Sequence, residues 1–374
     1  MGAKETSGAG KTGSGKRVTQ QDIADRVGVS RSAVSMAFRN HQGISAAMRE
    51  RIQKEATGMG YAPDPMLASL AAYRNRQRPA SFHGTLAWLV NTTSDFQWDT
   101  VGQFTEVFEG ARDSAARHGF TMEVFDVARD GAPRLARAGA VLRARNVAGI
   151  LVAPQPAPDT SLEEFPWADF SAVASGYTLA RPRLHVVAAA QFSAVLECLR
   201  QLRETGHRRI GFWLSPMHLK RTRLQYLGAW LASQEVAGLG GQVLAVLREK
   251  EFNPGVLDRW LRRYRPDGII SSSYMPDRLR ELGWRVPEDV SVVCPHLPNG
   301  ESPVSGVCEA PRDCGSAAAD LLVSLIHRGE RGMPRVPRTV LVDGCWVEGK
   351  TLRARSLLTE VRVAGKTGKP DTGS

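Results

Sequence analysis

The sequence predicts a mixed α/β protein in which a small all-α headpiece precedes a larger part built on parallel β-sheets. Two observations lead to this fold class. Residues 18–59 have a helical period of apolar residues, which two prolines at positions 63 and 65 then interrupt. Beyond residue 83, short apolar runs alternate with amphipathic stretches of ten to fifteen residues, which is the pattern of βαβ units.

The charge distribution favours a polyanionic partner. The 374 residues include 49 lysines and arginines against 38 acidic residues, a net charge of +11. Residues 1–80 hold 13 of these basic residues and 6 of the acidic ones, so most of the excess lies in the first fifth of the chain. A hydrophobic content of 42% is enough for a packed core, which excludes a chain that is disordered throughout.

Cysteine usage and the chain ends predict a cytoplasmic protein. Five cysteines without a CxxC pair indicate neither a disulfide framework nor a zinc ribbon, and they fit a reducing compartment. The N-terminus lacks the apolar segment of a signal peptide, and no apolar run approaches the length of a membrane span. Residues 1–17, rich in Gly, Ser, Thr and Lys, and residues 351–374 are expected to be disordered tails.

The headpiece has the residue spacing of a helix-turn-helix. Residues 19–22 have the spacing of a capping box, so a helix is expected to start at Gln20. Counted from Gln20, Ala24 is the fifth residue, Gly28 the ninth and Val34 the fifteenth. A small residue lets two helices approach, glycine can take the left-handed turn, and a branched residue fills the angle between the helices. The residues expected to complete this packing are Ile23, Val27, Val29 and Phe38.

The second helix, capped by Ser30, is the predicted reader of DNA. A helix that enters a major groove presents its N-terminal residues, here Arg31, Ser32 and Ala33, to base edges. Ser30 and nearby amides would hold phosphates, and Arg31 can form a bidentate pair with guanine. The alternative is a three-helix bundle that binds protein. A third helix is expected to begin after Ser45 and to bury Met48, Ile52, Ala56 and Met59.

Residues 64–82 form the expected hinge helix and linker. Asp64 and Pro65 are an N-cap followed by proline at the first helical position, which predicts a helix over residues 66–73. Eight residues are too few for a stable isolated helix in water. We therefore expect this helix to order only when it pairs with a dimer partner on DNA.

The larger part is expected to contain two α/β subdomains, because its predicted strands exceed one usual sheet. A helical period over residues 104–115, closed by Gly119, is the clearest of the intervening helices. The predicted strands are residues 85–90, 122–127, 148–153, 172–174, 185–188, 209–214, 243–246, 268–271, 290–293 and 339–342.

Several short motifs are typical of one family. In the headpiece they are residues 18–24, 28–30, 33–35, 44–45, 49–52 and 60–63, and downstream they are residues 205–212, 265–269 and 286–293. Together they resemble the LacI/GalR family of bacterial transcriptional regulators over roughly residues 18–350. The resemblance implies a helix-turn-helix headpiece over residues 18–63 and an effector-binding, dimerising core over residues 83–350. That core is implied to consist of two Rossmann-like subdomains, as in periplasmic binding proteins.

The resemblance implies a homodimer that binds a pseudo-palindromic operator in double-stranded DNA. It places Leu70 where a leucine wedges into the minor groove and kinks the duplex, with Ala71 beside it; packing of Leu70 in the core is the alternative. Met36 stands where arginine is common in the family, and Arg39 stands where asparagine is common. These departures imply that the phosphate and base contacts at these positions differ from those of most relatives. The complete predicted DNA-binding set is Thr19, Gln21, Ser30, Arg31, Ser32, Ala33, Ser35, Met36, Arg39, Ser45, Tyr61, Asp64, Leu70 and Ala71.

The resemblance also implies a small-molecule effector between the two subdomains, whose closure changes the dimer at the headpieces. For the aromatic residues Phe96, Trp98 and Phe252, the alternative is packing in the core; for Arg223, it is a place on a solvent-exposed helix face. The implied effector-binding residues, all near strand ends, are Phe96, Trp98, Arg223, Gln225, Phe252, Ser272 and His296.

Several polar groups usual in sugar-binding relatives are missing. Ala190 stands where an aspartate is usual, Gln225 stands where an arginine is usual, and the aspartate usual near His296 is absent. These departures favour an effector that is uncharged or differently polar, or no effector at all. A carbohydrate stays one candidate.

No catalytic, cofactor or metal signature accompanies these motifs. Residues 8–13 satisfy GxGxxG, but no apolar strand precedes them. Cys308, Cys314 and His296 lack the spacing of metal ligands. We therefore expect a non-enzymatic transcriptional regulator, a repressor, controlled by a small molecule and needing no cofactor. The alternatives are an α/β enzyme with a DNA-binding head and a ligand-independent or architectural dimeric DNA binder whose core only dimerises.

Overall fold

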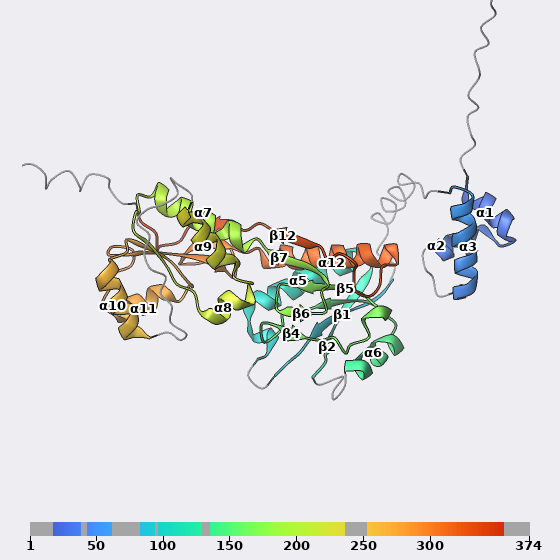
Figure 1. Ribbon diagram of the computed structural model, residues 1–374, viewed down its shortest axis with the longest axis horizontal. Coiled ribbons are helices and arrows are strands. Elements are labelled where there is room, and N and C mark those ends of the chain that lie inside the picture. The colour runs from blue at the N-terminus through green and yellow to red at the C-terminus, as the bar shows by residue number, and fades with distance from the viewer. Residues whose placement is uncertain are drawn as a thin grey trace, which may run out of the picture. The chain divides into compact units, whose positions relative to one another are not determined.

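The computed structural model of the protein describes residues 18–38, 43–61, 83–93, 96–128, 135–235 and 253–354 (Figure 1). The chain divides into two compact units, Met1–Ser81 and Phe82–Ser374. In the described ranges, no helix is long and apolar enough to cross a membrane. The expected tail at residues 1–17, the hinge helix, the strand at residues 243–246 and most of the C-terminal tail lie outside the described residues.

The first unit consists of three helices around one small core. They are α1 (Gln20–Val27), α2 (Arg31–Phe38) and α3 (Ala46–Gly58). The expected start of α1 is confirmed, because Thr19 and the third helical residue form a reciprocal capping box. The residues that fill the core are Ile23, Ala24, Val27, Val34, Ala37, Ile44, Ile52 and Ala56.

The turn between α1 and α2 has the predicted geometry. Gly28 has φ 76°, in the left-handed region, and its amide donates to the carbonyl of Ala24 at 2.9 Å. The amide of Val29 donates to the same carbonyl at 3.0 Å. Val34 is fully buried between the helices. The helix-turn-helix spacing read from the sequence is therefore confirmed.

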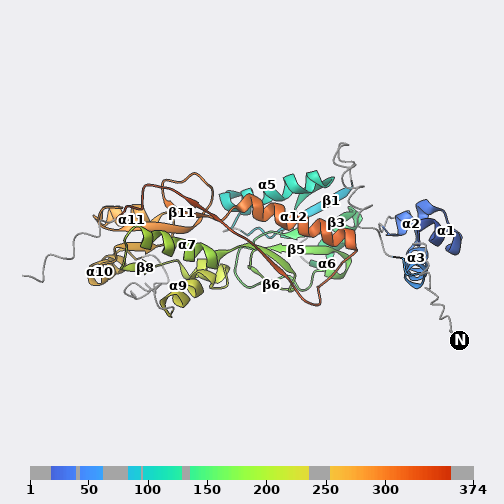
Figure 2. The same cartoon turned by 90° about the horizontal axis from the view of Figure 1, so that it is seen from above.

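The second unit contains a six-stranded sheet in the order β12–β7–β5–β3–β1–β2, and every neighbouring pair is parallel (Figures 1 and 2). Six of the predicted strands are present in it, with ends shifted by at most two residues. The strands are β1 (Gly84–Val90), β2 (Phe120–Asp126), β3 (Val147–Val152), β5 (Ser171–Ser175), β7 (His185–Ala189) and β12 (Thr339–Val342).

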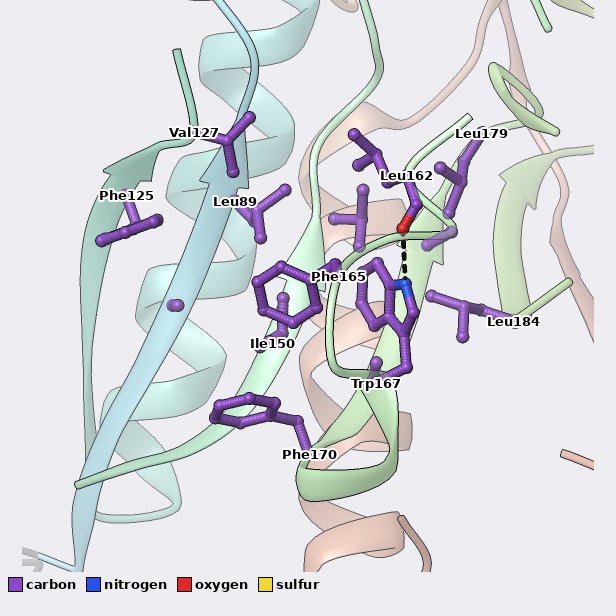
Figure 3. Packing of buried hydrophobic residues seen from close by; sticks show 14 of the residues in the cluster. Leu89, Phe125, Val127, Ile150, Leu162, Phe165, Trp167, Phe170, Leu179 and Leu184 are labelled. Carbon is purple, nitrogen blue, oxygen red and sulfur yellow. Dashed lines mark hydrogen bonds between the residues drawn. The ribbon is translucent and has the colours of Figure 1, made fainter. Parts of the chain in front are cut away.

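Alternate residues of β1 pack on opposite faces of this sheet. Leu86 and Trp88 lie in the core beneath α5 (Gly102–Arg117) and α12 (Pro311–Arg328). Leu89 lies in the other core, which α6 (Leu135–Ala144) and residues 162–170 cover. Figure 3 shows this second core, where the Trp167 indole N–H donates to the carbonyl of Leu162 at 2.7 Å. Both faces of the sheet are therefore buried, as expected for parallel strands.

Helices α5 and α12 lie side by side and cross at two glycines (Figure 2). A Cβ on Gly110 would lie 2.0 Å from the carbonyl oxygen of Arg312, and a Cβ on Gly315 would lie 1.9 Å from that of Val107. The close helix approach therefore requires glycine at both positions. This contact fixes α12 against the first sheet.

A second sheet has the order β13–β11–β10–β9–β8, with β13 antiparallel to β11. Its strands are β8 (Ile210–Phe212), β9 (Gly268–Ile270), β10 (Ser291–Leu297), β11 (Ser305–Cys308) and β13 (Cys345–Val347). Helices α7 (Gln191–Glu204) and α9 (Gln225–Glu235) cover one face, and α10 (Pro254–Tyr264) and α11 (Met275–Glu281) cover the other. The core therefore has the two predicted α/β subdomains.

The sequence did not predict four strands. They are β11, β13 and the pair β4 (Thr160–Ser161) and β6 (Leu179–Arg181), which forms a small separate sheet. Each has two to four residues, too few for a hydrophobic period to be recognised.

The chain passes between the two large sheets three times, after β7, after β11 and after β12. The second subdomain also continues beyond the boundary expected at residue 350. Thr351 is buried, and its hydroxyl donates to the carbonyl of Val292 at 2.6 Å, while Leu352 packs against the core. The first residues of the expected tail therefore belong to the core.

Candidate nucleic-acid interface and effector site

The N-terminus of α2 carries exposed polar groups of the kind that contact DNA. Arg31 and Ser32 are exposed in its first turn. Ser30 caps the helix, because its hydroxyl accepts a hydrogen bond from the amide of Ala33 at 3.2 Å. A helix N-terminus with an exposed guanidinium and two hydroxyls can hold a phosphate and pair with a base edge.

The other predicted DNA-binding residues of the headpiece divide into exposed and packed ones. Thr19, Gln21 and Ser45 are exposed. Met36 and Tyr61 are partly buried against the headpiece core, and the Tyr61 ring lies 5.3 Å from that of Phe38. Ala33 and Ser35 are intermediate in exposure, whereas Arg39, Asp64, Leu70 and Ala71 lie outside the described residues.

In the core, two histidines meet at the carboxyl ends of strands of the second sheet. His218 belongs to α8 (Pro216–Arg221), which follows β8, and His296 belongs to β10. Their ring centroids are 4.1 Å apart. The hydroxyl of Ser272 lies 3.3 Å from His296 Nε2, so two of the predicted effector-binding residues are brought together. Ligands of parallel α/β sheets bind at such carboxyl ends.

Both imidazoles are neutral at neutral pH. Burial lowers the pKa of His218 to about 4, and the nearby Arg221 adds to the effect. Burial also lowers the pKa of His296 well below its usual value, with a smaller contribution from His218. Within the described part of the chain, the buried Nε2 of His218 has no hydrogen-bond partner. This nitrogen therefore has an unused hydrogen-bonding capacity beside His296.

A buried carboxylate lies beside the histidine pair and joins the two subdomains. Glu309 follows β11 and is only 5% exposed. It accepts hydrogen bonds from the Tyr226 hydroxyl of α9, at 2.5 Å, and from the Gln103 amide of α5. Burial raises the pKa of Glu309, and the hydrogen bonds from Tyr226, Gln103 and Gln191 oppose that change. The Tyr226 ring also stacks on His218, with centroids 5.6 Å apart.

Arg221 forms a second connection between the subdomains. Its Nη1 donates to the carbonyls of Gln155, at 2.8 Å, and Pro156, at 2.7 Å, which follow β3 of the first sheet. Its guanidinium lies 5.4 Å from the centroid of the Phe104 ring. Gln155 is fully buried, and its Oε1 has no hydrogen-bond partner among the described residues.

The next arginine in the chain, Arg223, is exposed and lies with its guanidinium 5.2 Å from the ring centroid of Tyr177. Arg223 and Leu224 have φ of 49° and 60°, in the left-handed region that non-glycine residues rarely adopt. Burial raises the pKa of Tyr177, and Arg223 opposes that change. This turn places both arginines of residues 221–223 against the first subdomain.

The remaining predicted effector residues differ in their contacts. The centroid of the Phe96 ring lies 6.0 Å from that of Phe104, the ring that Arg221 contacts. Trp98 packs against Trp88 and Phe108 in the core, which is the alternative expected for it. Gln225 begins α9 and is half-buried, whereas Phe252 lies outside the described residues.

The sequence interpretation did not single out His218, Tyr226, Glu309, Gln103, Arg221, Gln155 and Gln191. Gln191 directly follows Ala190, the position where an aspartate was expected, and it is 8% exposed. Its Oε1 has no hydrogen-bond partner in the ranges that the structure covers. A search of the residues after each predicted strand would have found Gln155 and Gln191, but Glu309 follows β11, which was not predicted.

Two family models match the chain. Residues 19–64 match "Bacterial regulatory proteins, lacI family", and residues 199–352 match "Periplasmic binding protein-like domain". Among curated proteins, the repressor CytR of Escherichia coli K12 is 28% identical over 212 residues, which cover 55% of this chain. The match spans only 57% of the length of CytR. The regulator GntR of the same strain is 26% identical over 339 residues, which cover 86% of this chain and 95% of GntR.

Solved structures share the fold. A CelR–cellobiose complex is 21% identical with a TM-score of 0.51, and covers 90% of this chain and 100% of its own. The lac repressor dimer bound to operator and the anti-inducer ONPF is 18% identical with a TM-score of 0.51, covering 91% and 100%. The chain therefore combines a headpiece that matches the lacI family of bacterial regulatory proteins with a periplasmic-binding-protein-like core, and its relatives include the regulators CytR and GntR.

Proposed function

We propose that the protein is a sequence-specific transcriptional repressor that acts as a homodimer in the cytoplasm and responds to a small molecule. The observation that carries this proposal is a recognition helix with an exposed N-terminus in the same chain as a polar cluster shared by two subdomains. A two-fold dimer reads a pseudo-palindromic operator, one half-site for each headpiece.

The headpiece supports base readout by α2. Arg31 is exposed and can form a bidentate pair with guanine, whereas Ser30 and Ser32 suit phosphate oxygens. Leu70 and Ala71, from the expected hinge helix, complete the proposed contacts in the minor groove.

The chemistry of the cluster supports an uncharged polar effector. The neutral His218 and His296 rings, the Ser272 hydroxyl and the Gln191 amide offer hydrogen bonds without a permanent charge. The carboxylate of Glu309 already accepts from protein donors. Because CelR of the same fold is in complex with cellobiose, carbohydrates are the first class to test.

The effector would act on the equilibrium between open and closed arrangements of the core. The hydrogen bonds of Arg221 and Glu309 would break and re-form in such a motion, because each of these residues joins groups from both subdomains. A ligand that binds one arrangement better changes operator affinity by the same factor by which operator changes ligand affinity. No chemical step is needed, and we propose no enzymatic activity.

A screen of neutral sugars by thermal unfolding tests the effector. A ligand at about 100 times its Kd raises the free energy of unfolding by roughly 2.7 kcal/mol. The expected result is a sugar that stabilises the wild-type protein and changes its affinity for the operator. The same sugar should stabilise the Gln191→Leu variant less. If no compound stabilises the protein and operator binding is intact, the result favours the second candidate function, a ligand-independent dimeric DNA binder. The observation that supports this candidate is Ala190, which stands where sugar-binding relatives usually have an aspartate.

A further inference from the structure

The edge of the six-stranded sheet opposite the polar cluster is strongly basic. All its strands run parallel, so their carboxyl ends share one edge, where Gln155 and Gln191 lie, and their amino ends share the other. Helices α5, α6 and α12 end at this amino edge, since each leads into the start of a strand. The arginines of these helix ends and of the segments that follow are Arg117, Arg143, Arg145, Arg183, Arg328, Arg331, Arg335 and Arg338.

Acidic residues neutralise only part of this charge. Arg143 pairs with Asp169, and Arg328 and Arg338 share Glu330. Arg117 donates to the hydroxyl of Ser316 at 2.9 Å. In the part of the chain that the structure describes, four exposed arginines have no acidic partner within 4.0 Å: Arg145, Arg183, Arg331 and Arg335.

Favourable interactions with helix ends explain only part of this charge. Arginines within the last turn of a helix interact favourably with its dipole, which accounts for Arg117, Arg143 and Arg328. Arg145 directly follows α6, and its amide donates to the carbonyl of Val141 at 3.0 Å, so it shares this effect. Arg183, Arg331 and Arg335 lie farther from any helix C-terminus, where the effect has faded, and like charges at one edge repel one another. An anion outside the chain would compensate this repulsion.

The same edge contains a concave site. The segment from Glu330 to Arg338 lines an open pocket of about 320 Å³, together with the buried His185. The His185 Nδ1 accepts a hydrogen bond from the Arg338 amide at 2.9 Å, so its other ring nitrogen carries the proton and is a donor. Guanidinium groups around such a pocket suit phosphate oxygens.

The length of the chain limits how far DNA bound by the headpiece can lie from this edge. The core begins at this same edge, where His83 precedes β1. Only residues 62–82 separate it from the headpiece, and even fully extended this link of 21 residues reaches at most about 75 Å. The link carries three more arginines, Arg74, Arg76 and Arg78.

We propose that Arg145, Arg183, Arg331 and Arg335 form a phosphate-binding surface that contacts the same DNA duplex as the headpiece. The inference rests on the proposed DNA-binding function and extends it from the headpiece to the core. Such contacts do not distinguish base sequences. They increase the affinity for DNA through its phosphate backbone, and they make that affinity fall more steeply as salt is added.

Salt titration of DNA binding by full-length variants tests this surface. The probe is a mixed-sequence duplex of about 40 base pairs, roughly four helical turns. Each lost phosphate contact is expected to reduce the steepness of log affinity against log salt by about 0.9. A double variant removes two arginines from each protomer of the proposed homodimer, so Arg331→Gln/Arg335→Gln and Arg145→Gln/Arg183→Gln should each reduce the steepness by about 3.6. At about 0.1 M salt, each double variant should bind at least tenfold more weakly.

Matched controls separate this surface from charge in general. Arg208 and Arg259 of the second subdomain are also exposed, so Arg208→Gln/Arg259→Gln removes the same charge and should keep the wild-type slope. Arg331→Lys/Arg335→Lys keeps the charge and should also keep the slope. If the edge variants and the Arg208/Arg259 control have equal slopes, the phosphate-binding surface is overturned. DNA binding by the wild-type chain in the same experiment would still support the proposed function. A wild-type chain that binds no duplex would overturn both.

Discussion

The hydroxyl of Tyr226 donates a 2.5 Å hydrogen bond to Glu309 Oε1, and the amide of Gln103 donates to the other oxygen of the same carboxylate. Tyr226 belongs to the second subdomain and Gln103 to the first. One buried carboxylate therefore joins elements that must move relative to each other if the core opens. Beside it, the stacked rings of His218 and Tyr226 connect this junction to the candidate effector site.

Replacing Glu309 by leucine should destabilise the core. The change leaves the buried Tyr226 hydroxyl without its acceptor, which costs about 1–3 kcal/mol, and it also removes the acceptor of the half-buried Gln103 amide. Glu309→Gln keeps an acceptor for Tyr226 and should cost less. Urea unfolding of the two variants measures the difference. Equal stability of both with wild type would contradict the bridging role.

Acid should destabilise the core partly through His218. Its pKa is about 4 in the folded state, below its usual 6.5, so the stability is fully present above pH 6.5 and falls as the pH decreases toward 4. His218→Phe keeps a stacked ring but cannot be protonated. At about pH 4.5 the variant should exceed wild type by roughly 2–3 kcal/mol, and at pH 7.5 the two should be similar. Thermal unfolding at both pH values checks this, and a constant difference would contradict the burial of a neutral imidazole.

Gly110→Ala should disrupt the packing of α5 on α12. The added Cβ would lie 2.0 Å from the Arg312 carbonyl, so a helix must shift, at a cost of about 3 kcal/mol. Gly102→Ala is the matched control, because no atom lies within 4 Å of its added Cβ. It should leave stability unchanged or raise it by about 0.5 kcal/mol. Chemical denaturation distinguishes the two, and a tolerated alanine at position 110 would contradict the close helix crossing.

Arg31→Ala should alter which sequences the protein prefers. Loss of a bidentate pair with guanine relaxes the preference at one base pair by about 1–3 kcal/mol. Arg51, exposed on α3, provides the control, and Arg51→Ala should leave the preference unchanged. Binding to a panel of single-base operator variants measures the preference. An identical profile for Arg31→Ala and wild type would place the base readout on other residues.

The headpiece could be predicted from the sequence almost completely, because its determinants are local. The capping box at Thr19, the left-handed Gly28 and the buried Val34 all depend on residues a few positions apart. The two α/β subdomains followed from hydrophobic periodicity, which likewise needs no long-range information.

The candidate effector site was predicted only in part, because it depends on contacts between distant segments. Glu309 and Gln103 are 206 residues apart and meet through a strand of four residues that carries no recognisable period. Ser272 and His296 were identified through the family resemblance, but the contact of His296 with His218 depends on where α8 places its side chains. The sequence left two roles open for Trp98, stacking on an effector or packing in the core, and its contact with Trp88 shows that it packs in the core.

The most direct test of the central claim is selection of bound fragments from random DNA by the full-length protein at one salt concentration near physiological. A sequence-specific dimeric regulator predicts recovery of a palindrome roughly two helical turns long, with half-sites related by the two-fold axis. Recovery of unrelated sequences whose binding is lost steeply with added salt would contradict that claim, because it would leave charge alone as the basis of DNA binding.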